Sequence, residues 1–233
     1  MTNIIWWIIF PYITLTIMIL GVLYRYAFRQ LSWTAPSTEF FERKKLKFGS
    51  LLFHWGIVFA FVGHVMGMVI PMEFYEFIGI ADHMYHFGAI VAGGFAGLMI
   101  VVGDIILLYR KITDERIRAH TSFGNYFSLI MVLVVAAIGA YMTIIYNTTV
   151  IAYEYRATIG PWFRSLFIFQ PKYNLMGGAP LIFRLHVISA FLLFASIPFT
   201  NLIHIFSFPI KYLKRVPQQY RARNQYQSRK KNL

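Results

Sequence analysis

The chain has 233 residues, of which 58% are hydrophobic and 13% are charged, whereas a typical soluble domain has about 25% charged residues. Its net charge of +13 would suit nucleic-acid binding, but the basic residues form short clusters between long apolar runs, which argues against that function. The absence of cysteine excludes disulfides, thiolate metal sites, cysteine-ligated iron–sulfur clusters and covalently attached haem.

Apolar runs along the chain are long enough to cross a bilayer, for which about 20 residues are needed. The predicted transmembrane helices are about residues 4–25, 48–70, 85–109, 121–147 and 181–210. The first run is too long for a signal peptide and lacks its basic residues and cleavage site, so we expect it to be retained. The predicted fold is an all-α, polytopic bundle of five transmembrane helices over residues 1–213, followed by a basic tail of residues 214–233.

The distribution of lysine and arginine predicts how these helices are oriented. Segments 25–47 and 110–120 contain six and four of these residues, and the tail from Lys211 contains eight. In contrast, 71–84 contains none and 148–180 contains three. Cytoplasmic loops are enriched in Lys and Arg, so we expect the N-terminus outside and the C-terminus in the cytoplasm. The basic loops and tail should then dock any soluble partner.

Four histidines fall within or near the ends of two predicted spans: His54 and His64 in the second, His186 and His204 in the fifth. Ionisable residues at membrane depth are costly and usually functional; the alternative for each is a polar contact between helices. Because the two helices run in opposite directions, His64 should lie level with His186 near the outer face, and His54 level with His204 near the inner face. Two such pairs suit two non-covalent b-type haems.

The spacing of the histidines differs between the two helices. Ten residues separate the first pair and eighteen the second, which correspond to rises of about 15 Å and about 27 Å in continuous helices. Pro198 should kink the fifth helix, and tilt should absorb the rest of the difference. We expect the two irons to lie about 20 Å apart along the membrane normal.

Other residues near the histidines could complete haem pockets. Three glycines lie beside the histidines of the second span: Gly56, Gly63 and Gly67. They let a flat macrocycle approach the backbone, with close helix packing as the alternative. Arg184 could pair with a haem propionate or extend to the interface. Asp104, about one and a half turns before Arg110, is interpreted as part of an ion pair near the inner surface.

Several motifs along the chain together resemble one family. They are LFHWG at 52–56, GHVMGM at 63–68, YRY at 24–26, WTA at 33–35, HMYH at 83–86, GPWFR at 160–164, FRLH at 183–186, PFTNLIH at 198–204 and PIKYL at 209–213. In this order they are similar to the gamma (cytochrome b) subunit of membrane-bound respiratory nitrate reductase, in the form found in Gram-positive bacteria.

The resemblance implies a quinol-oxidising anchor in the bacterial plasma membrane. His64 and His186 would ligate the outer, distal haem, and His54 and His204 the inner, proximal one. Electrons from menaquinol or ubiquinol would pass through the outer and then the inner haem to a cytoplasmic iron–sulfur (beta) subunit. A molybdenum (alpha) subunit would then reduce nitrate to nitrite, because this chain shows no nitrate-reducing site of its own.

The expected quinol site departs from that family in one respect. Some members carry a lysine at the start of the third helix, whereas this chain has none over 71–109. We expect Gly63, Tyr85 and His86 to form the site instead, because tyrosine or histidine could accept a hydrogen bond or proton from quinol. The alternative is that Tyr85 belongs to an interfacial aromatic belt and His86 only lies at the interface.

Other functions stay open on the residues alone. A dihaem b subunit of a heterodisulfide- or sulfite-reductase-type complex would have the same helix plan. A transporter or proton channel could use the histidines as a relay, but such proteins usually show internal repeats and interrupted helices, which this sequence lacks. A membrane anchor without cofactors would be distinguished by its absorption spectrum.

Overall fold

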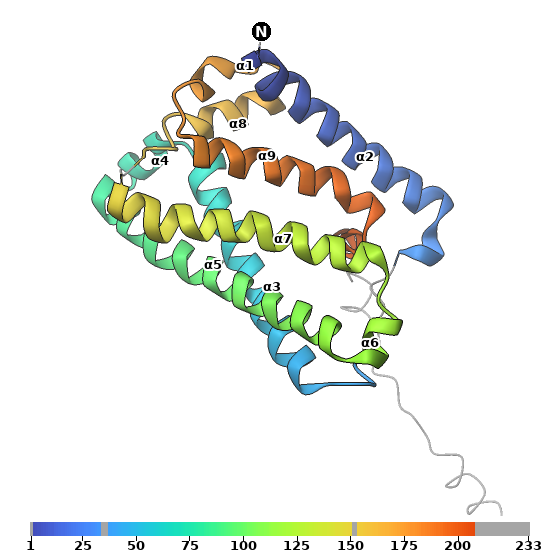
Figure 1. Cartoon of the computed structure of the whole chain (residues 1–233). Coiled ribbons are helices and arrows are strands. Elements are labelled where there is room, and N and C mark those ends of the chain that lie inside the picture. The colour runs from blue at the N-terminus through green and yellow to red at the C-terminus, as the bar shows by residue number, and fades with distance from the viewer. Residues whose placement is uncertain (1, 34–36, 151–152, 208–233) are drawn as a thin grey trace, which may run out of the picture.

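The computed structural model describes residues 2–33, 37–150 and 153–207, and within them every regular element is a helix. Five of these helical stretches are long and apolar enough to cross a membrane: Thr2–Phe28, Lys44–Val69, Asp82–Thr113, Phe123–Val150 and Leu181–Phe199. The predicted all-α bundle with five spans is therefore confirmed (Figure 1). The predicted tail of residues 214–233 lies outside the described residues.

Three of the spans combine an α-helix with a π-helical segment at the end predicted to lie outside. The first contains α1 (Thr2–Ile4), η1 (Ile5–Ile9) and α2 (Phe10–Phe28), the second α3 (Lys44–His64) and η3 (Val65–Val69), and the fourth α7 (Phe123–Tyr141) and η4 (Met142–Val150). The third span is α5 (Asp82–Thr113). Shorter helices connect them: η2 (Gln30–Ser32), α4 (Met72–Phe77), α6 (Glu115–Ala119), α8 (Ile159–Phe167) and η5 (Tyr173–Met176).

The fifth span is shorter than predicted and is interrupted. Helix α9 (Leu181–Ser196) passes into a single 3-10 turn, η6 (Ile197–Phe199), and Thr200 is extended with φ −123° and ψ −179°. A second 3-10 segment, η7 (Asn201–Phe206), follows. Pro198 has no N–H to donate and crowds the preceding turn, so the kink expected there is a break. The rise of about 27 Å, which assumed one continuous helix, therefore does not apply.

The spans pack in an order in which the two helices that carry the histidines, α3 and α9, are not direct neighbours. Helix α3 packs along α5, α5 along α7, α7 along α9, and α9 along α2. In the described part of the chain, α3 and α9 share no comparable seam. The α3–α5 seam is close because of its glycines: a Cβ added at Gly103 would lie 2.6 Å from the backbone nitrogen of Phe53, and one at Gly56 would lie 2.8 Å from Ile100.

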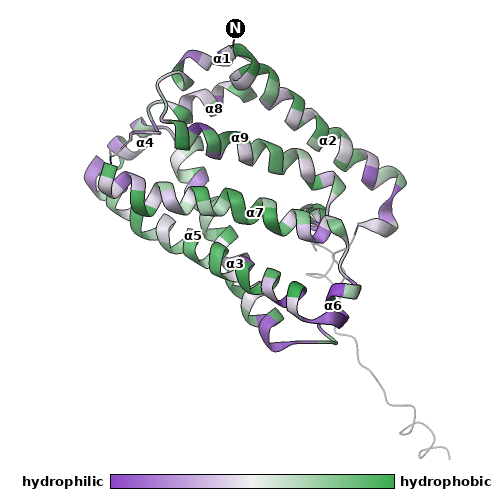
Figure 2. Ribbon diagram, in the orientation of Figure 1, coloured by the Kyte–Doolittle hydropathy of each residue, from purple (hydrophilic) through white to green (hydrophobic). Residues whose placement is uncertain are grey.

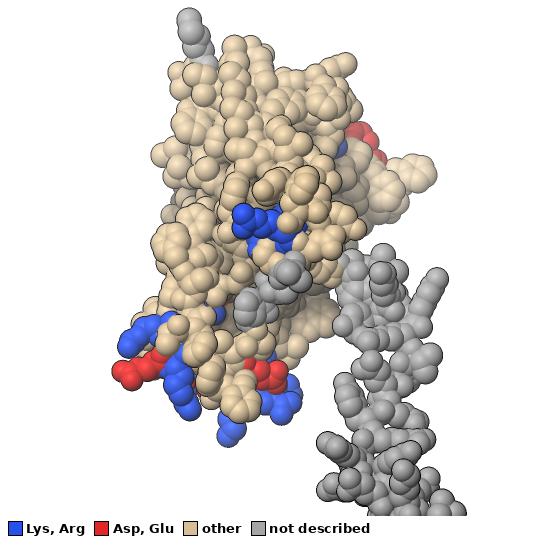
Figure 3. Space-filling view, turned by 90° about the vertical axis from the view of Figure 1, so that its right-hand side faces the viewer, with Lys and Arg blue, Asp and Glu red and all other residues tan. Residues whose placement is uncertain are grey.

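Hydrophobic residues predominate along the spans, and hydrophilic residues gather toward their ends (Figure 2). Many large apolar residues on the spans are exposed, as expected for surfaces that face lipid rather than water. On the face shown in Figure 3, most lysine and arginine side chains lie toward the end of the bundle opposite the N-terminus. That end is the one that the sequence predicts to face the cytoplasm; it is called the inner end below, and the opposite end the outer end.

Candidate functional site

The structure brings the four histidine rings together in the two predicted pairs. The ring centroids of His64 and His186 are 6.1 Å apart, with 19° between the ring planes. Those of His54 and His204 are 6.2 Å apart, with 58° between the planes. Each pair joins α3 to the fifth span, the outer pair through α9 and the inner pair through the separate segment η7.

The separation within each pair fits a metal bound between the two rings. Two metal–nitrogen bonds of about 2 Å each, plus the distance from each nitrogen to its own ring centre, account for a centroid separation close to 6 Å. Among the described residues, no group of three or more His, Cys, Asp or Glu side chains could hold a bare metal ion. Paired histidines instead suit a metal whose other ligands belong to a macrocycle, as in haem.

Backbone carbonyls orient three of the four rings. The Nδ1 atom of His54 lies 2.7 Å from the Ser50 carbonyl oxygen, and that of His64 lies 2.6 Å from the Ala60 oxygen. In η7, His204 makes the same contact with the backbone of its own turn, at 2.5 Å. Each Nδ1–H can therefore donate to a carbonyl, which leaves Nε2 free as the ligand, as is usual for metal-binding histidines.

Surroundings of the outer pair also fit a haem. A Cβ at Gly63 would meet no atom within 4 Å, so the backbone beside His64 is open to a flat group. The Nε atom of Arg184 is buried and has no hydrogen-bond partner in the described part of the chain, which fits pairing with a propionate. Helix α7 also lies close to His186: a Cβ added at Gly139 would lie 3.0 Å from the imidazole ring. Gly139 was not singled out from the sequence, where it is one glycine in an apolar run.

The other two glycines predicted for haem pockets contact protein. Gly56 faces Ile100 and Met99 of α5, which favours its alternative role in helix packing. A Cβ at Gly67 would lie 2.9 Å from the Tyr155 hydroxyl and 3.1 Å from that of Tyr85. Because Gly67 has no side chain, both tyrosine hydroxyls can lie against its backbone, within one helical turn of His64.

The ion pair predicted for Asp104 is wrong. Both carboxylate oxygens of Asp104 are buried without a hydrogen-bond partner among the described residues. Arg110 instead pairs with Glu42, at 2.8 Å, and also binds Thr38. The two α5 residues are six positions apart, whereas only side chains three or four apart are neighbours on a helix. Arg110 thus ties the inner end of α5 to the segment that leads into α3.

A polar cluster lies at the outer end of α5, where the quinol site was predicted. The outer polar cluster consists of Asp82, Tyr85, His86, Glu154 and Arg156. His86 Nε2 lies 2.7 Å from Glu154 Oε2. The guanidinium of Arg156 donates two hydrogen bonds to Glu154 and one to Asp82, each 2.9 Å long. It also lies 4.0 Å from the ring centroid of Tyr85.

Two members of the outer polar cluster come from a loop for which only a role in topology was predicted. Glu154 and Arg156 lie between η4 and α8, far along the chain from α5. Burial raises the pKa of Glu154, but hydrogen bonds from Arg156 and His86 outweigh it, so the pKa lies below its usual range. Burial lowers the pKa of Arg156, but hydrogen bonds to Glu154 and Asp82 outweigh it and raise the pKa above its usual range. Both groups are therefore ionised at neutral pH.

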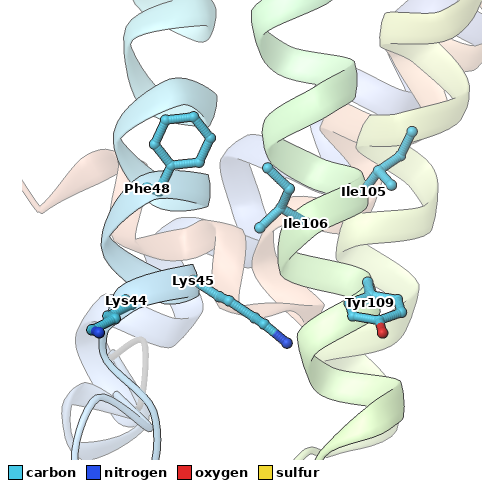
Figure 4. A pocket seen from close by; sticks show the side chains of 6 residues that line it. All are labelled: Lys44, Lys45, Phe48, Ile105, Ile106 and Tyr109. Carbon is cyan, nitrogen blue, oxygen red and sulfur yellow. The ribbon is translucent and has the colours of Figure 1, made fainter.

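A groove at the inner ends of α3 and α5 lies apart from the histidine pairs (Figure 4). It is lined by Lys44, Lys45, Phe48, Ile105, Ile106 and Tyr109. The Lys45 ammonium extends toward Tyr109 and lies 5.1 Å from its ring centroid. The groove contains no histidine, so it is separate from both ring pairs.

Comparison with known proteins matches residues 3–223 to the family described as nitrate reductase gamma subunit. The nitrate reductase gamma chain of Bacillus subtilis (strain 168) is 44% identical over 224 residues, which are 96% of this chain and 100% of that protein. The respiratory nitrate reductase 1 gamma chain of Escherichia coli (strain K12) is 33% identical over 226 residues, 95% of this chain and 98% of that one. The nitrate reductase-like protein NarX of Mycobacterium tuberculosis (strain ATCC 25618 / H37Rv) is 36% identical over 223 residues, 95% of this chain but 34% of that protein.

Proposed function

The chain belongs to the nitrate reductase gamma subunit family, and from this premise we propose that it is the quinol-oxidising dihaem cytochrome b of its complex. It is an integral membrane protein and a subunit of an oxidoreductase. The observation that carries the proposal is the approach of four histidine rings in two pairs, each with the separation that one iron between two imidazoles requires.

In the proposal, His64 and His186 hold the outer haem, and His54 and His204 hold the inner haem. Bound haem would supply reversible one-electron chemistry at each site. The protein contributes the orientation of three of the four rings, through the carbonyl contacts of Nδ1 described above, and the cation of Arg184 for an outer propionate. The apolar surroundings of the spans keep water away from both pairs.

Membrane quinol, either menaquinol or ubiquinol, is the proposed electron donor. It would bind at the outer end, near Gly63, Tyr85 and His86, and release its protons outside. Electrons would cross from the outer to the inner site and leave for an iron–sulfur subunit on the cytoplasmic side of the plasma membrane. The molybdenum subunit would receive them and reduce nitrate to nitrite. With the inside negative, this transfer opposes the field by about 2.3 kcal/mol per charge per 100 mV, which the redox reaction must supply.

The family assignment favours this role over a dihaem subunit of another complex, whose helix plan would be the same. The test is a dithionite-reduced minus oxidised spectrum of the purified complex, with haem quantified per gamma chain. Two b-type haems per chain are expected, and addition of a short-chain quinol should reduce them. A complex with full nitrate reductase activity but no haem in this chain would refute the proposal.

A further inference from the structure

The contact between His86 and Glu154 fixes which nitrogen of His86 can act as a base. An ionised carboxylate can only accept hydrogen bonds, so neutral His86 donates its Nε2 proton to Glu154 across the 2.7 Å contact. The lone pair then lies on Nδ1, which has no hydrogen-bond partner among the described residues. This is the arrangement by which a carboxylate orients an imidazole for general-base catalysis.

The outer polar cluster extends from the neighbourhood of the outer histidine pair to the surface. At one end, the Tyr85 hydroxyl lies 3.4 Å from that of Tyr155, beside Gly67 and one turn from His64. The Arg156 side chain in the middle is 1% exposed, and at the other end that of Asp82 is 63% exposed. The side chains of His86 and Glu154 are 30% and 31% exposed, so both are accessible from outside the bundle.

We propose that Glu154 is the positioning residue of quinol oxidation: it holds His86 as the base for quinol and stabilises the imidazolium that forms when His86 takes up a proton. This inference rests on the proposed function, since it needs quinol at the outer end. Arg156 in turn fixes Glu154 through two hydrogen bonds and links it to Asp82. The Nη1 atom of Arg156 is buried without a partner among the described residues, so one donor remains for a quinone oxygen or a water molecule.

The protons and electrons balance as follows. Oxidation of one quinol to quinone breaks two O–H bonds and releases two protons and two electrons. In the proposed function, the group held by the outer histidine pair would supply the one-electron acceptor for these electrons. For each proton, Nδ1 of His86 accepts the quinol proton, and the imidazolium that forms keeps its Nε2–H hydrogen bond to the ionised Glu154. Nδ1 then releases that proton to water at the outer surface, which restores neutral His86 before the next transfer.

Several other titratable groups face this pair and influence its protonation. They are Asp82 and Tyr85 from α5, Tyr75 from α4, and Tyr155 and Arg156 from the loop before α8. Burial raises the pKa of Tyr75 and of Tyr155, so these phenols stay neutral at neutral pH. Arg156 carries a positive charge and Asp82 a negative one, and they lie against each other. Glu154 is therefore the carboxylate that acts directly on His86.

The experiment measures quinol-driven haem reduction from pH 5 to 9 in membranes that contain the whole complex. The variants are Glu154→Gln and Glu154→Asp, with Glu76→Gln as the matched control that removes the same charge from the exposed helix α4. Haem content and dithionite reduction are measured first, so that only variants with both haems are compared. Binding of a non-oxidisable quinol analogue is measured across the same pH range as a readout independent of turnover.

In Glu154→Gln, the maximal rate should fall about tenfold, which is less than the roughly 10²–10⁴-fold contribution of general acid–base catalysis as a whole, because His86 itself is retained. The low-pH limb of the rate profile should move, because the variant no longer presents a carboxylate to the protonated imidazole. The pH dependence of analogue binding should move with it, and Glu154→Asp should restore part of the rate. The inference would be overturned if Glu154→Gln reduced the haems as fast as the control Glu76→Gln. It would also be overturned if Glu154→Gln were slow but its pH profile were unchanged. Failure of quinol to reduce the haems of the wild-type complex would instead overturn the proposed function.

Discussion

Replacement of Gly103 by alanine should loosen the α3–α5 seam and weaken haem binding at the inner histidine pair. A Cβ at this position would lie 2.6 Å from the Phe53 nitrogen and 2.9 Å from the Gly49 carbonyl oxygen. Ordinary contact begins at 3.4 Å, so α3 must move away by about 0.8 Å, and backbone atoms cannot rotate aside as side chains can. Phe53 immediately precedes His54, so this movement displaces one ring of the inner histidine pair.

The expected change in the free energy of unfolding is the difference between two effects of the substitution. Overpacking of a close seam costs about 1–3 kcal/mol. Because the contacts of Gly103 are with backbone atoms, its replacement should cost an amount near the upper end of that range. Alanine regains about 1 kcal/mol over glycine in a helix, which leaves a net loss of about 1–2 kcal/mol. Gly88 is the matched control on the same helix, because a Cβ there would meet nothing within 4 Å. Gly88→Ala should therefore be neutral or slightly stabilising.

The assay for this prediction is the haem content of the purified complex and the midpoint of its thermal loss of the reduced b-type spectrum. Gly103→Ala should lower that midpoint by several degrees relative to Gly88→Ala and should lose the inner haem before the outer one. Equal midpoints and equal haem contents in the two variants would show that the seam tolerates a methyl group. The reasoning from backbone contact would then be refuted.

The remaining predictions concern the ligands, the quinol site and docking. His54→Ala should remove one b-type haem and His186→Ala the other, as measured by haem quantification and redox titration; loss of the same haem in both would contradict the pairing. With both haems retained, His86→Phe should slow quinol-driven haem reduction, and Tyr85→Phe should weaken the effect of a quinol-analogue inhibitor. Unchanged rate and inhibition in both variants would place the quinol site elsewhere. Deletion of residues 217–233 should reduce copurification of the soluble subunits, and undiminished copurification would confine docking to the loops.

The spans and the ring pairs could be predicted because each depends on a sequence pattern that can be interpreted without knowledge of the tertiary contacts. Hydropathy over about 20 residues identifies a span whatever its neighbours are. Opposite helix directions then place His64 near His186 and His54 near His204 without any knowledge of the packing. Geometry within the pairs could not be predicted, because it depends on the break at Pro198 and Thr200, which puts His204 on a segment separate from α9.

The polar contacts were harder to foresee, because they join segments far apart in the sequence. Glu154 reaches His86 across 68 positions, and Arg110 reaches Glu42 across the same number. Neither pair has a local spacing that would indicate it. For Asp104, proximity along the sequence was misleading, since the arginine nearest to it points to another partner. Only the tertiary approach of the loop before α8 to the start of α5 shows that Glu154 belongs to the candidate site.

The interruption after Ser196 also means that the two ring pairs depend on different parts of the backbone. His186 lies on the continuous helix α9, whereas His204 lies on η7, beyond the extended residue Thr200. Arg25 of α2 donates hydrogen bonds to the carbonyl oxygens of Pro198 and Thr200, where η7 begins. The 58° angle between His54 and His204 therefore depends on the first span as well as on the second, whereas the outer pair joins α3 directly to α9.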